Sequence, residues 1–213
     1  MSLSDQLQRI FDAERTLREA EKLLLRKQRA DDLVALLSTE TTRALTMEDR
    51  QEGSMRLERL ADLCAQVPGP AMADALIAIL NDSEPRVRVA AGEALRDVGY
   101  ERYAEVARAI ERALDRGETG PAMSELPWVL AEIAEPSALS LIRRFLDHPD
   151  PEVVAAAIEA LSQLGEPDAA QDLKRFLGDP RSVIIEDFEN ETKTTLGELA
   201  EDALRELGYR DAD

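Results

Sequence analysis

The sequence is poor in the residues that build most metal and catalytic sites. It holds one cysteine and one histidine in 213 residues. Zinc sites need several such ligands, and an internal disulfide needs two cysteines, so neither is expected. The sequence also has no Gly-rich phosphate loop, no nucleophile elbow and no calcium-loop spacing. We therefore expect no enzyme activity, no metal and no cofactor.

The single cysteine and the single histidine are expected to have structural or solvent-exposed places. Cys64 lies in an apolar helical phase, Leu60 to Cys64, and free cysteine is usually buried. His148 lies in a polar turn, Asp147 to Asp150, where a lone histidine is expected to be solvated. Neither pattern predicts chemistry.

Aromatic residues and long apolar runs are also scarce. Aromatic residues make up 4% of the chain, although hydrophobic residues make up 44%. The apolar residues are mainly alanine and leucine, which favour helices over a sheet sandwich. No apolar run reaches the ~18 residues of a membrane span, and the N-terminus does not resemble a signal peptide. We expect a cytoplasmic all-α protein.

The charge is strongly negative and unevenly distributed. The formal net charge is −18. Residues 1–50 hold 9 basic and 10 acidic residues, so almost all of the excess belongs to residues 51–213. Such a field repels phosphate backbones and favours a basic partner, or it serves only solubility.

A repeat is the main positive signal. Residues 80–99 and 146–165 align without a gap. In each segment, a helix end is followed by an acidic turn, a proline, an alanine-rich stretch and a glycine. Pro85 and Pro151 suit the first turn of a helix, and Gly99 and Gly165 suit the position after its end.

Leucines extend this phase along the chain and predict stacked helix pairs. One set is expected at the centre of each second helix: Leu60, Leu95, Leu130, Leu161 and Leu204. A second set is expected to close the first helices: Leu80, Leu114, Leu146 and Leu177. The fold is therefore expected to be an α-α superhelix whose stacked units share one core.

These motifs resemble the HEAT repeat family, in the short form common in bacterial proteins and in phycobilisome-lyase-type repeats. The residues that carry the resemblance are Asp82, Pro85, Val87, Arg88, Ala91, Ala94, Leu95 and Gly99, which recur as Asp147 or Asp150, Pro151, Val153, Ala157, Ala160, Leu161 and Gly165. The resemblance covers about residues 49–209 and implies a HEAT-like solenoid. The arginine that recurs in the family stands at Arg88, but the next two units have Met123 and Val154 there.

The first 48 residues fall outside this period. A heptad of leucine and isoleucine predicts a long helix over about 4–29, and a second helix is expected over about 31–45. Glu14 and Glu21 interrupt the heptad seam, so we favour a cap on the end of the solenoid over a dimerising helix. Residues 1–48 are assigned to this cap and residues 49–213 to the solenoid.

Two later segments depart from the repeat. Pro127 falls inside a second helix, where proline removes a hydrogen bond and produces a kink. The last unit is longer by an insertion at 181–195. Val183, Ile184, Ile185 and Phe188 suit strands, and residues 189–191 suit a turn, so a short β-hairpin and an irregular acidic loop are the two alternatives.

The residues two before and two after each central leucine share one helical face. Stacked second helices would place these faces side by side, as a ridge that is mainly acidic with one tryptophan. We call this set the second-helix ridge: Glu58, Asp62, Glu93, Asp97, Trp128, Glu132, Glu159, Gln163, Asp202 and Glu206.

The resulting functional hypothesis is a non-enzymatic scaffold whose second-helix ridge binds a basic protein partner, with Trp128 as an apolar or cation–π anchor. A solvated acidic face, with Trp128 filling the core, is the simpler alternative. The family resemblance adds a subunit of a chromophore-attachment factor. Binding to nucleic acid is disfavoured by the charge, whereas mimicry of nucleic acid would still bind a basic protein.

Overall fold

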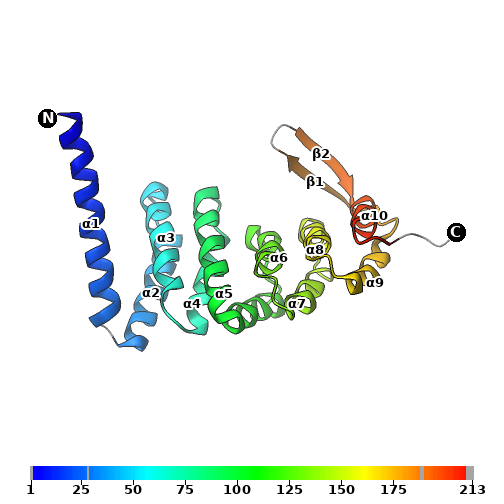
Figure 1. Ribbon diagram of the computed structural model, residues 1–213, viewed down its shortest axis with the longest axis horizontal. Coiled ribbons are helices and arrows are strands. Elements are labelled where there is room, and N and C mark those ends of the chain that lie inside the picture. Colours follow the sequence, from blue (N-terminus) through cyan, green and yellow to red (C-terminus); the bar gives the residue numbers. More distant parts are fainter. Residues whose placement is uncertain (1, 28, 188–189, 210–213) are drawn as a thin grey trace.

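The computed structural model describes residues 2–27, 29–187 and 190–209, and these contain ten α-helices and one small sheet. The helices stack in two parallel rows, so the all-α solenoid that the leucine spacing predicts is confirmed (Figure 1). The central leucines of the second helices are all buried, between 0% and 8% exposed. Of the leucines expected to close the first helices, Leu177 differs, because its side chain is 43% exposed.

The two rows follow the predicted pairs. The second helices form the upper row in Figure 1: α3 (Arg50–Ala65), the first half of α5 (Pro85–Asp115), α6 (Pro121–Ile133), α8 (Pro151–Leu164) and α10 (Leu196–Glu206). The first helices form the lower row: α2 (Ala30–Leu45), α4 (Pro70–Leu80), the second half of α5, α7 (Ala138–Phe145) and the short α9 (Ala170–Leu173), which lies between 3₁₀ turns at Pro167–Ala169 and Lys174–Phe176.

Proline and glycine mark helix boundaries at most of the predicted places. Pro85 and Pro151 each occupy the first turn of a helix. Gly165 ends α8 in the left-handed conformation, at φ 68°. α6 runs through Pro127 without ending there.

The predicted helix end at Gly99 is displaced by three residues. Gly99 itself is helical, and the break comes at Arg102, where φ −141° and ψ 48° mark a kink between the two helices that make up α5. Gly99 is buried where α5 meets α6, and a side chain there would overlap Ile133. Its missing Cβ therefore serves close helix packing rather than helix termination.

Polar side chains in the turns join neighbouring units. The carboxylate of Asp82, in the turn before α5, accepts hydrogen bonds from Arg50 at 2.7 and 2.9 Å and is almost fully buried. Asn81 Oδ1 accepts a hydrogen bond from the backbone N–H of Ala122 in the next unit, at 3.1 Å. Arg88 donates to the Asp82 and Ser83 carbonyl groups of its own turn and also lies 3.7 Å from the carboxylate of Glu125 on α6.

His148 is buried, so the prediction of a solvated histidine is wrong. Its Nδ1 accepts a hydrogen bond from the Asp150 N–H at 3.1 Å, which leaves Nε2 to donate to the Glu118 carbonyl at 3.1 Å. The neutral ring with its proton on Nε2 satisfies both partners. His148 therefore links two turns, and its role is structural.

Cys64 is fully buried, as predicted. Burial raises the pKa of its thiol to about 11, because the thiolate is poorly solvated among apolar side chains.

The insertion forms a hairpin. β1 (Ser182–Asp187) pairs antiparallel with β2 (Asn190–Thr195), with Ser182 opposite Thr195 and Asp187 opposite Asn190. The prediction of a turn at 189–191 is wrong for Asn190 and Glu191, because these residues belong to β2. Phe188 and Glu189 lie outside the described residues. A capping box between Thr195 and Glu198 starts α10 directly after β2.

α1 (Leu3–Lys27) is the predicted long N-terminal helix, and α2 matches the predicted second helix. The C-terminal part of α1 packs on the rest of the molecule through Leu24 and Leu25 and an ion pair between Glu21 and Arg59 at 3.0 Å. The first half projects beyond α3 (Figure 1). The capping role and the domain boundary at 48/49 remain predictions.

Candidate functional site

The ten residues of the second-helix ridge all lie on the upper row, and none of them is buried. They are distributed in pairs: Glu58 and Asp62 on α3, Glu93 and Asp97 on α5, Trp128 and Glu132 on α6, Glu159 and Gln163 on α8, Asp202 and Glu206 on α10. The ten residues thus share the upper row, and their role in binding remains a prediction.

Three of its carboxylates are already paired with arginine. Arg59 lies 3.1 Å from Asp62, and Arg205 lies 2.6 Å from Asp202. Arg96 of α5 lies 2.6 Å from Glu132 of α6 and so joins two second helices. These pairs lower the charge that an incoming partner meets at those points.

Four other ridge carboxylates have no basic partner within the described residues 2–27, 29–187 and 190–209: Glu58, Glu93, Asp97 and Glu159. Glu206 accepts a hydrogen bond from the Ser162 hydroxyl at 2.6 Å, which leaves its charge uncompensated. The ridge therefore holds surplus negative charge.

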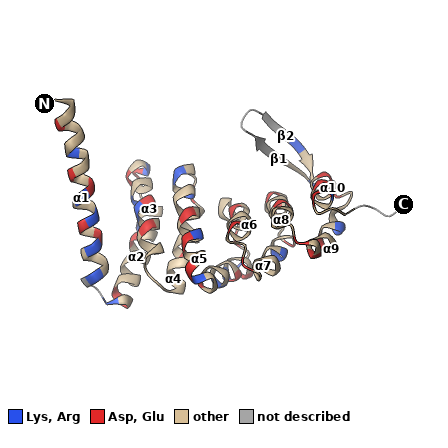
Figure 2. Cartoon of the chain, in the orientation of Figure 1, with Lys and Arg blue, Asp and Glu red and all other residues tan. Residues whose placement is uncertain are grey.

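Counted over whole helices, the excess of acidic over basic residues is concentrated at the C-terminal end of the upper row. α6, α8 and α10 hold a single basic residue, Arg205, and the ribbon of Figure 2 is coloured red for acidic positions there, with little blue. We call their eight acidic residues the acidic end: Glu125, Glu132, Glu152, Glu159, Glu198, Glu201, Asp202 and Glu206. On α3, and on α5 as far as Glu101, acidic and basic residues are equal in number.

The spacing rule used for the ridge missed part of the acidic end. Glu152 lies seven residues before Glu159, on the same face of α8, and its carboxylate accepts a hydrogen bond from the Ile184 N–H of β1 at 3.2 Å. A search one turn further along each helix would have found it. Its contact with the hairpin could not be read from the sequence.

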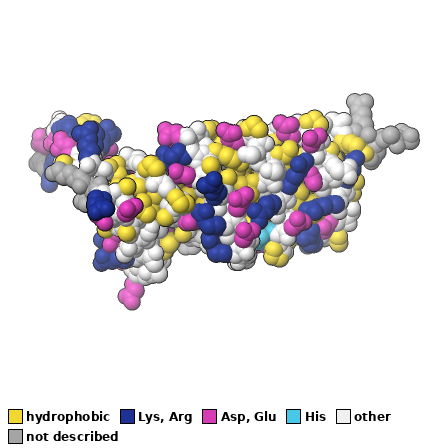
Figure 3. Space-filling model, turned by 90° about the horizontal axis from the view of Figure 1, so that it is seen from below, with side chains coloured by type: hydrophobic (Ala, Val, Ile, Leu, Met, Phe, Trp, Pro, Cys, Tyr) yellow, Lys and Arg dark blue, Asp and Glu magenta, His cyan; other side chains and the backbone are white. Residues whose placement is uncertain are grey.

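The first-helix face has a different charge pattern. Figure 3 shows basic and acidic side chains interspersed on it. Many of them form ion pairs between units, such as Arg112 with Asp74 at 2.9 Å and Arg143 with Asp172 at 2.6 Å. Negative charge is thus compensated on one face and uncompensated on the other.

Glu159 lies at the centre of the acidic end and is half-buried. Burial raises the pKa of its carboxyl, and the nearby charges of Glu206 and Glu152 raise the pKa further. The ionised form of Glu159 is therefore disfavoured in the free protein. A cation beside it would relieve both effects.

This raised pKa predicts a stabilising substitution. Because the pKa of Glu159 is higher in the folded state than in the unfolded state, ionisation destabilises the fold above that pKa. Glu159→Gln should therefore raise the midpoint of thermal unfolding at pH 7 by roughly 1–3 °C. At pH 3.5 the carboxyl is protonated in both states, so the gain should disappear. Thermal unfolding followed by circular dichroism at both pH values measures it.

Glu93→Gln is the matched control, because Glu93 is an exposed, unpaired ridge residue on α5. It should change the midpoint little at either pH. Equal gains for both variants, or a gain for Glu159→Gln that persists at pH 3.5, would contradict the assignment.

Trp128 lies on the wall of a cleft between α5 and α6. The cleft has a volume of about 220 Å³ and is lined by Val89 and Gly92 of α5 and by Val129 of α6. Trp128 is only partly buried, whereas its neighbour Pro127 is buried in the core. A partly exposed indole beside a cleft is a suitable contact for an apolar side chain or, over the face of its ring, for a cationic one.

A wider cleft lies between the N-terminal parts of α3 and α5. Its volume is about 800 Å³, and Met55, Glu58 and Arg86 contribute to its lining. Met55 is 58% exposed. The upper row therefore offers two neighbouring hollows along the ridge.

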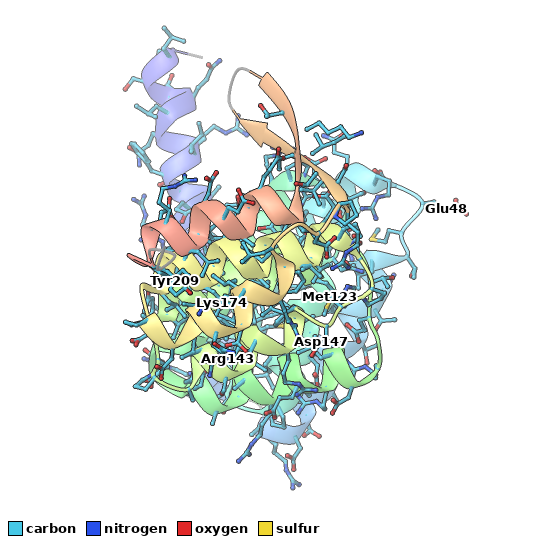
Figure 4. All side chains as sticks on the ribbon, turned by 90° about the vertical axis from the view of Figure 1, so that its right-hand side faces the viewer. Glu48, Met123, Arg143, Asp147, Lys174 and Tyr209 are labelled. Carbon is cyan, nitrogen blue, oxygen red and sulfur yellow. The ribbon has the colours of Figure 1, made fainter. Side chains whose placement is uncertain are left out.

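α1 and the hairpin flank the upper row. Both rise from the same side of the solenoid in Figure 1, and the end-on view of Figure 4 agrees. At the C-terminal end, Lys174 lies 3.9 Å from the ring centre of Tyr209 (Figure 4). The exposed surface of the upper row, which we call the second-helix face, thus lies between two projecting elements, α1 and the hairpin.

Within the part of the chain that the structure describes, no group of three or more histidine, cysteine, aspartate or glutamate side chains is arranged to hold a metal ion. No helix in these ranges has the length and apolar character needed to cross a bilayer.

Comparison with known families supports a repeat of HEAT type. Residues 124–189 match the family model described as HEAT repeats. This stretch runs from α6 through α8 into the hairpin, and it is less than half of the chain. Together with the stacked helix pairs, the match supports a HEAT-like repeat protein. No curated protein matches the chain.

Two solved structures cover most of the chain at low identity. One is an engineered protein that is 16% identical, with 89% of this chain and 96% of that chain covered and a TM-score of 0.37. The other is a computationally designed armadillo repeat protein for modular peptide recognition, at 15% identity, 91% and 92% coverage and a TM-score of 0.36. With TM-scores this low, the architecture rests on the helix packing described above.

Proposed function

We propose that this repeat protein is a non-enzymatic scaffold that binds a basic protein segment along the second-helix ridge. The observation that carries the proposal is the surplus of unpaired carboxylate on α8 and α10 within the described residues. Glu159, half-buried between Glu152 and Glu206, is the clearest case. A lysine or arginine placed there would compensate a charge that the protein itself leaves unpaired.

Trp128 is the proposed anchor of the complex. It lies on α6, the first helix of the acidic end, next to the balanced charges of α3 and α5. Aromatic residues beside partly open clefts are frequent hot spots of protein interfaces. Because Trp128 is the only tryptophan, its fluorescence reports on this point of the ridge alone.

The test uses a synthetic peptide of alternating lysine and serine, with an alternating glutamate and serine peptide for comparison. Only the basic peptide should change Trp128 fluorescence on titration. Its affinity should fall about tenfold as the salt rises from 50 to 200 mM, because screening weakens exposed charge pairs. The double variant Glu159→Gln, Glu206→Gln should weaken binding by about tenfold, close to the effect of losing one good charge contact.

The matched control is Glu111→Gln, which removes one exposed charge from the first-helix side of α5. This variant should bind the basic peptide as the unmodified protein does. Equal binding of both peptides, or equal loss in Glu111→Gln and in the double variant, would refute the ridge as the binding surface.

Two finer expectations belong to the same proposal. A cytoplasmic location suits a scaffold of this kind, and nucleic acid is not the expected ligand because the acidic end repels phosphates. The chromophore-attachment alternative predicts an absorbance change when the protein is mixed with a bilin. That measurement separates it from the scaffold.

A further inference from the structure

α1 exposes apolar side chains that the solenoid does not cover. Leu3, Leu7, Ile10 and Phe11 are 50–85% exposed, and we call these four residues the overhang. α1 is long enough for its C-terminal part to pack on α3 while its N-terminal part extends beyond it (Figure 1). The overhang is therefore an unpartnered apolar face next to the second-helix ridge.

The overhang faces the same way as the docked part of α1. Glu21 and Leu24 contact the body, and steps of three or four residues lead back from them through Leu17 and Glu14 to Ile10 and Leu7. Residues at these spacings share one side of a helix. One side of α1 therefore has two parts. Its C-terminal part packs on α3, and its N-terminal part extends beyond α3, carries the overhang and faces the second-helix face.

The face below changes character along its length. Next to the overhang, α3 and α5 expose Met55 and Val89, which are 58% and 60% exposed, among balanced charges. Toward the hairpin, α6, α8 and α10 present eight carboxylates and only Arg205. The end of the second-helix face formed by α3 and α5 is therefore apolar and nearly neutral, whereas the end formed by α6, α8 and α10 is acidic.

We propose that the ligand of this face is a two-part segment, with an apolar half held by the overhang and a basic half held by the acidic end. This inference rests on the proposed function and specifies its partner. The charge complementarity fixes the basic half, and the position of the overhang at the opposite end fixes the apolar half. Such a segment covers apolar surface that is otherwise open to water.

The test compares three synthetic peptides by fluorescence titration of Trp128. The first joins an alanine–leucine half to a lysine–serine half, the second joins the halves in reverse order, and the third is the lysine–serine half alone. One of the two-part peptides should bind at least about tenfold more tightly than the basic half alone, since apolar burial adds to the charge contact. The preferred order gives the direction in which the segment lies.

Leu7 and Leu23 supply a matched pair of variants on α1. They are 51% and 53% exposed, and sixteen residues of helix place them on opposite sides. Leu7→Ser should remove most of the added affinity and leave binding of the basic half unchanged. Leu23→Ser should change neither. Circular dichroism of both variants checks that α1 remains helical.

The outcomes separate this inference from the proposed function. No binding of the basic half would refute the proposed function itself. The two-part ligand alone would be refuted if the basic half bound and an apolar half added no affinity. Equal losses of affinity for the two-part peptide in Leu7→Ser and Leu23→Ser would refute it as well. Sedimentation showing a dimer of the free protein that Leu7→Ser dissociates would also overturn it, because a second copy would then occupy the overhang.

Discussion

Replacing Arg50 with alanine is expected to destabilise the protein by about 3 kcal/mol, the scale for breaking a buried ion pair. Asp82 is 4% exposed, and its carboxylate depends on two hydrogen bonds from Arg50. Without Arg50, a buried negative charge retains only the N–H of Glu84 as a partner. Urea unfolding followed by circular dichroism measures the loss.

The structure also predicts an asymmetry between the two partners. Arg50 is 46% exposed, so in Asp82→Ala its guanidinium can turn to water, and the loss should be smaller than in Arg50→Ala. The matched control is Arg112→Ala, because its partner Asp74 is 37% exposed and already hydrated. That variant should lose no more than about 1 kcal/mol. Equal losses in Arg50→Ala and Arg112→Ala would show that burial of Asp82 does not matter.

Two glycines of one helix are expected to respond to alanine with opposite signs. Gly99→Ala places a methyl group against Ile133, and such overpacking costs roughly 1–3 kcal/mol. Gly92→Ala meets only Leu80 Cδ1, at 3.9 Å, which is an ordinary contact. Alanine favours a helix over glycine by about 1 kcal/mol, so Gly92→Ala should stabilise the protein. Gly99→Ala should destabilise it, because the steric cost exceeds that gain.

A double-mutant cycle assigns the cause. Ile133→Ala removes the atoms that a methyl group at Gly99 would overlap. In the Ile133→Ala background, Gly99→Ala should therefore lose most of its cost. The same destabilisation in both backgrounds would mean that the effect of Gly99 lies in the backbone and not in its contact with α6.

The sequence was sufficient for the helix pairs but not for every boundary between them. Leucines at thirty-odd-residue spacing predict the stacked pairs because a single amphipathic helix cannot bury its own apolar stripe. Gly99 and Gly165 occupy the same place in two aligned units, yet only Gly165 ends a helix. Pro167 follows two residues after Gly165 and prevents continuation, whereas the helix that contains Gly99 continues to the kink at Arg102.

The burial of His148 and the projection of α1 depend on contacts that span the chain. His148 is buried because the Glu118 carbonyl, thirty residues away, accepts its ring N–H. The heptad of α1 predicts a helix correctly, but it cannot show where the body of the protein ends beneath it. The burial of His148 and the projection of α1 both depend on how the units stack. A local sequence pattern cannot predict that stacking.

The same limit applies to the ridge. The spacing around each central leucine places ten side chains on one exposed face correctly, because the helical period fixes direction. It could not show that Arg96 reaches Glu132 from the neighbouring helix or that Glu159 is half-buried beside Glu206. Which carboxylates remain unpaired is therefore a result of three-dimensional packing.

The kink in α5 has a mechanical consequence. The two halves of α5 supply the second helix of one unit and the first helix of the next, and they meet at Arg102 without an intervening loop. The equivalent joints after α3 and α6 contain four residues each, 66–69 and 134–137. A joint of one residue has fewer backbone dihedral angles that can change than a joint of four. A force that opens or closes the arc should therefore change the angle between helices more at the longer joints than at Arg102.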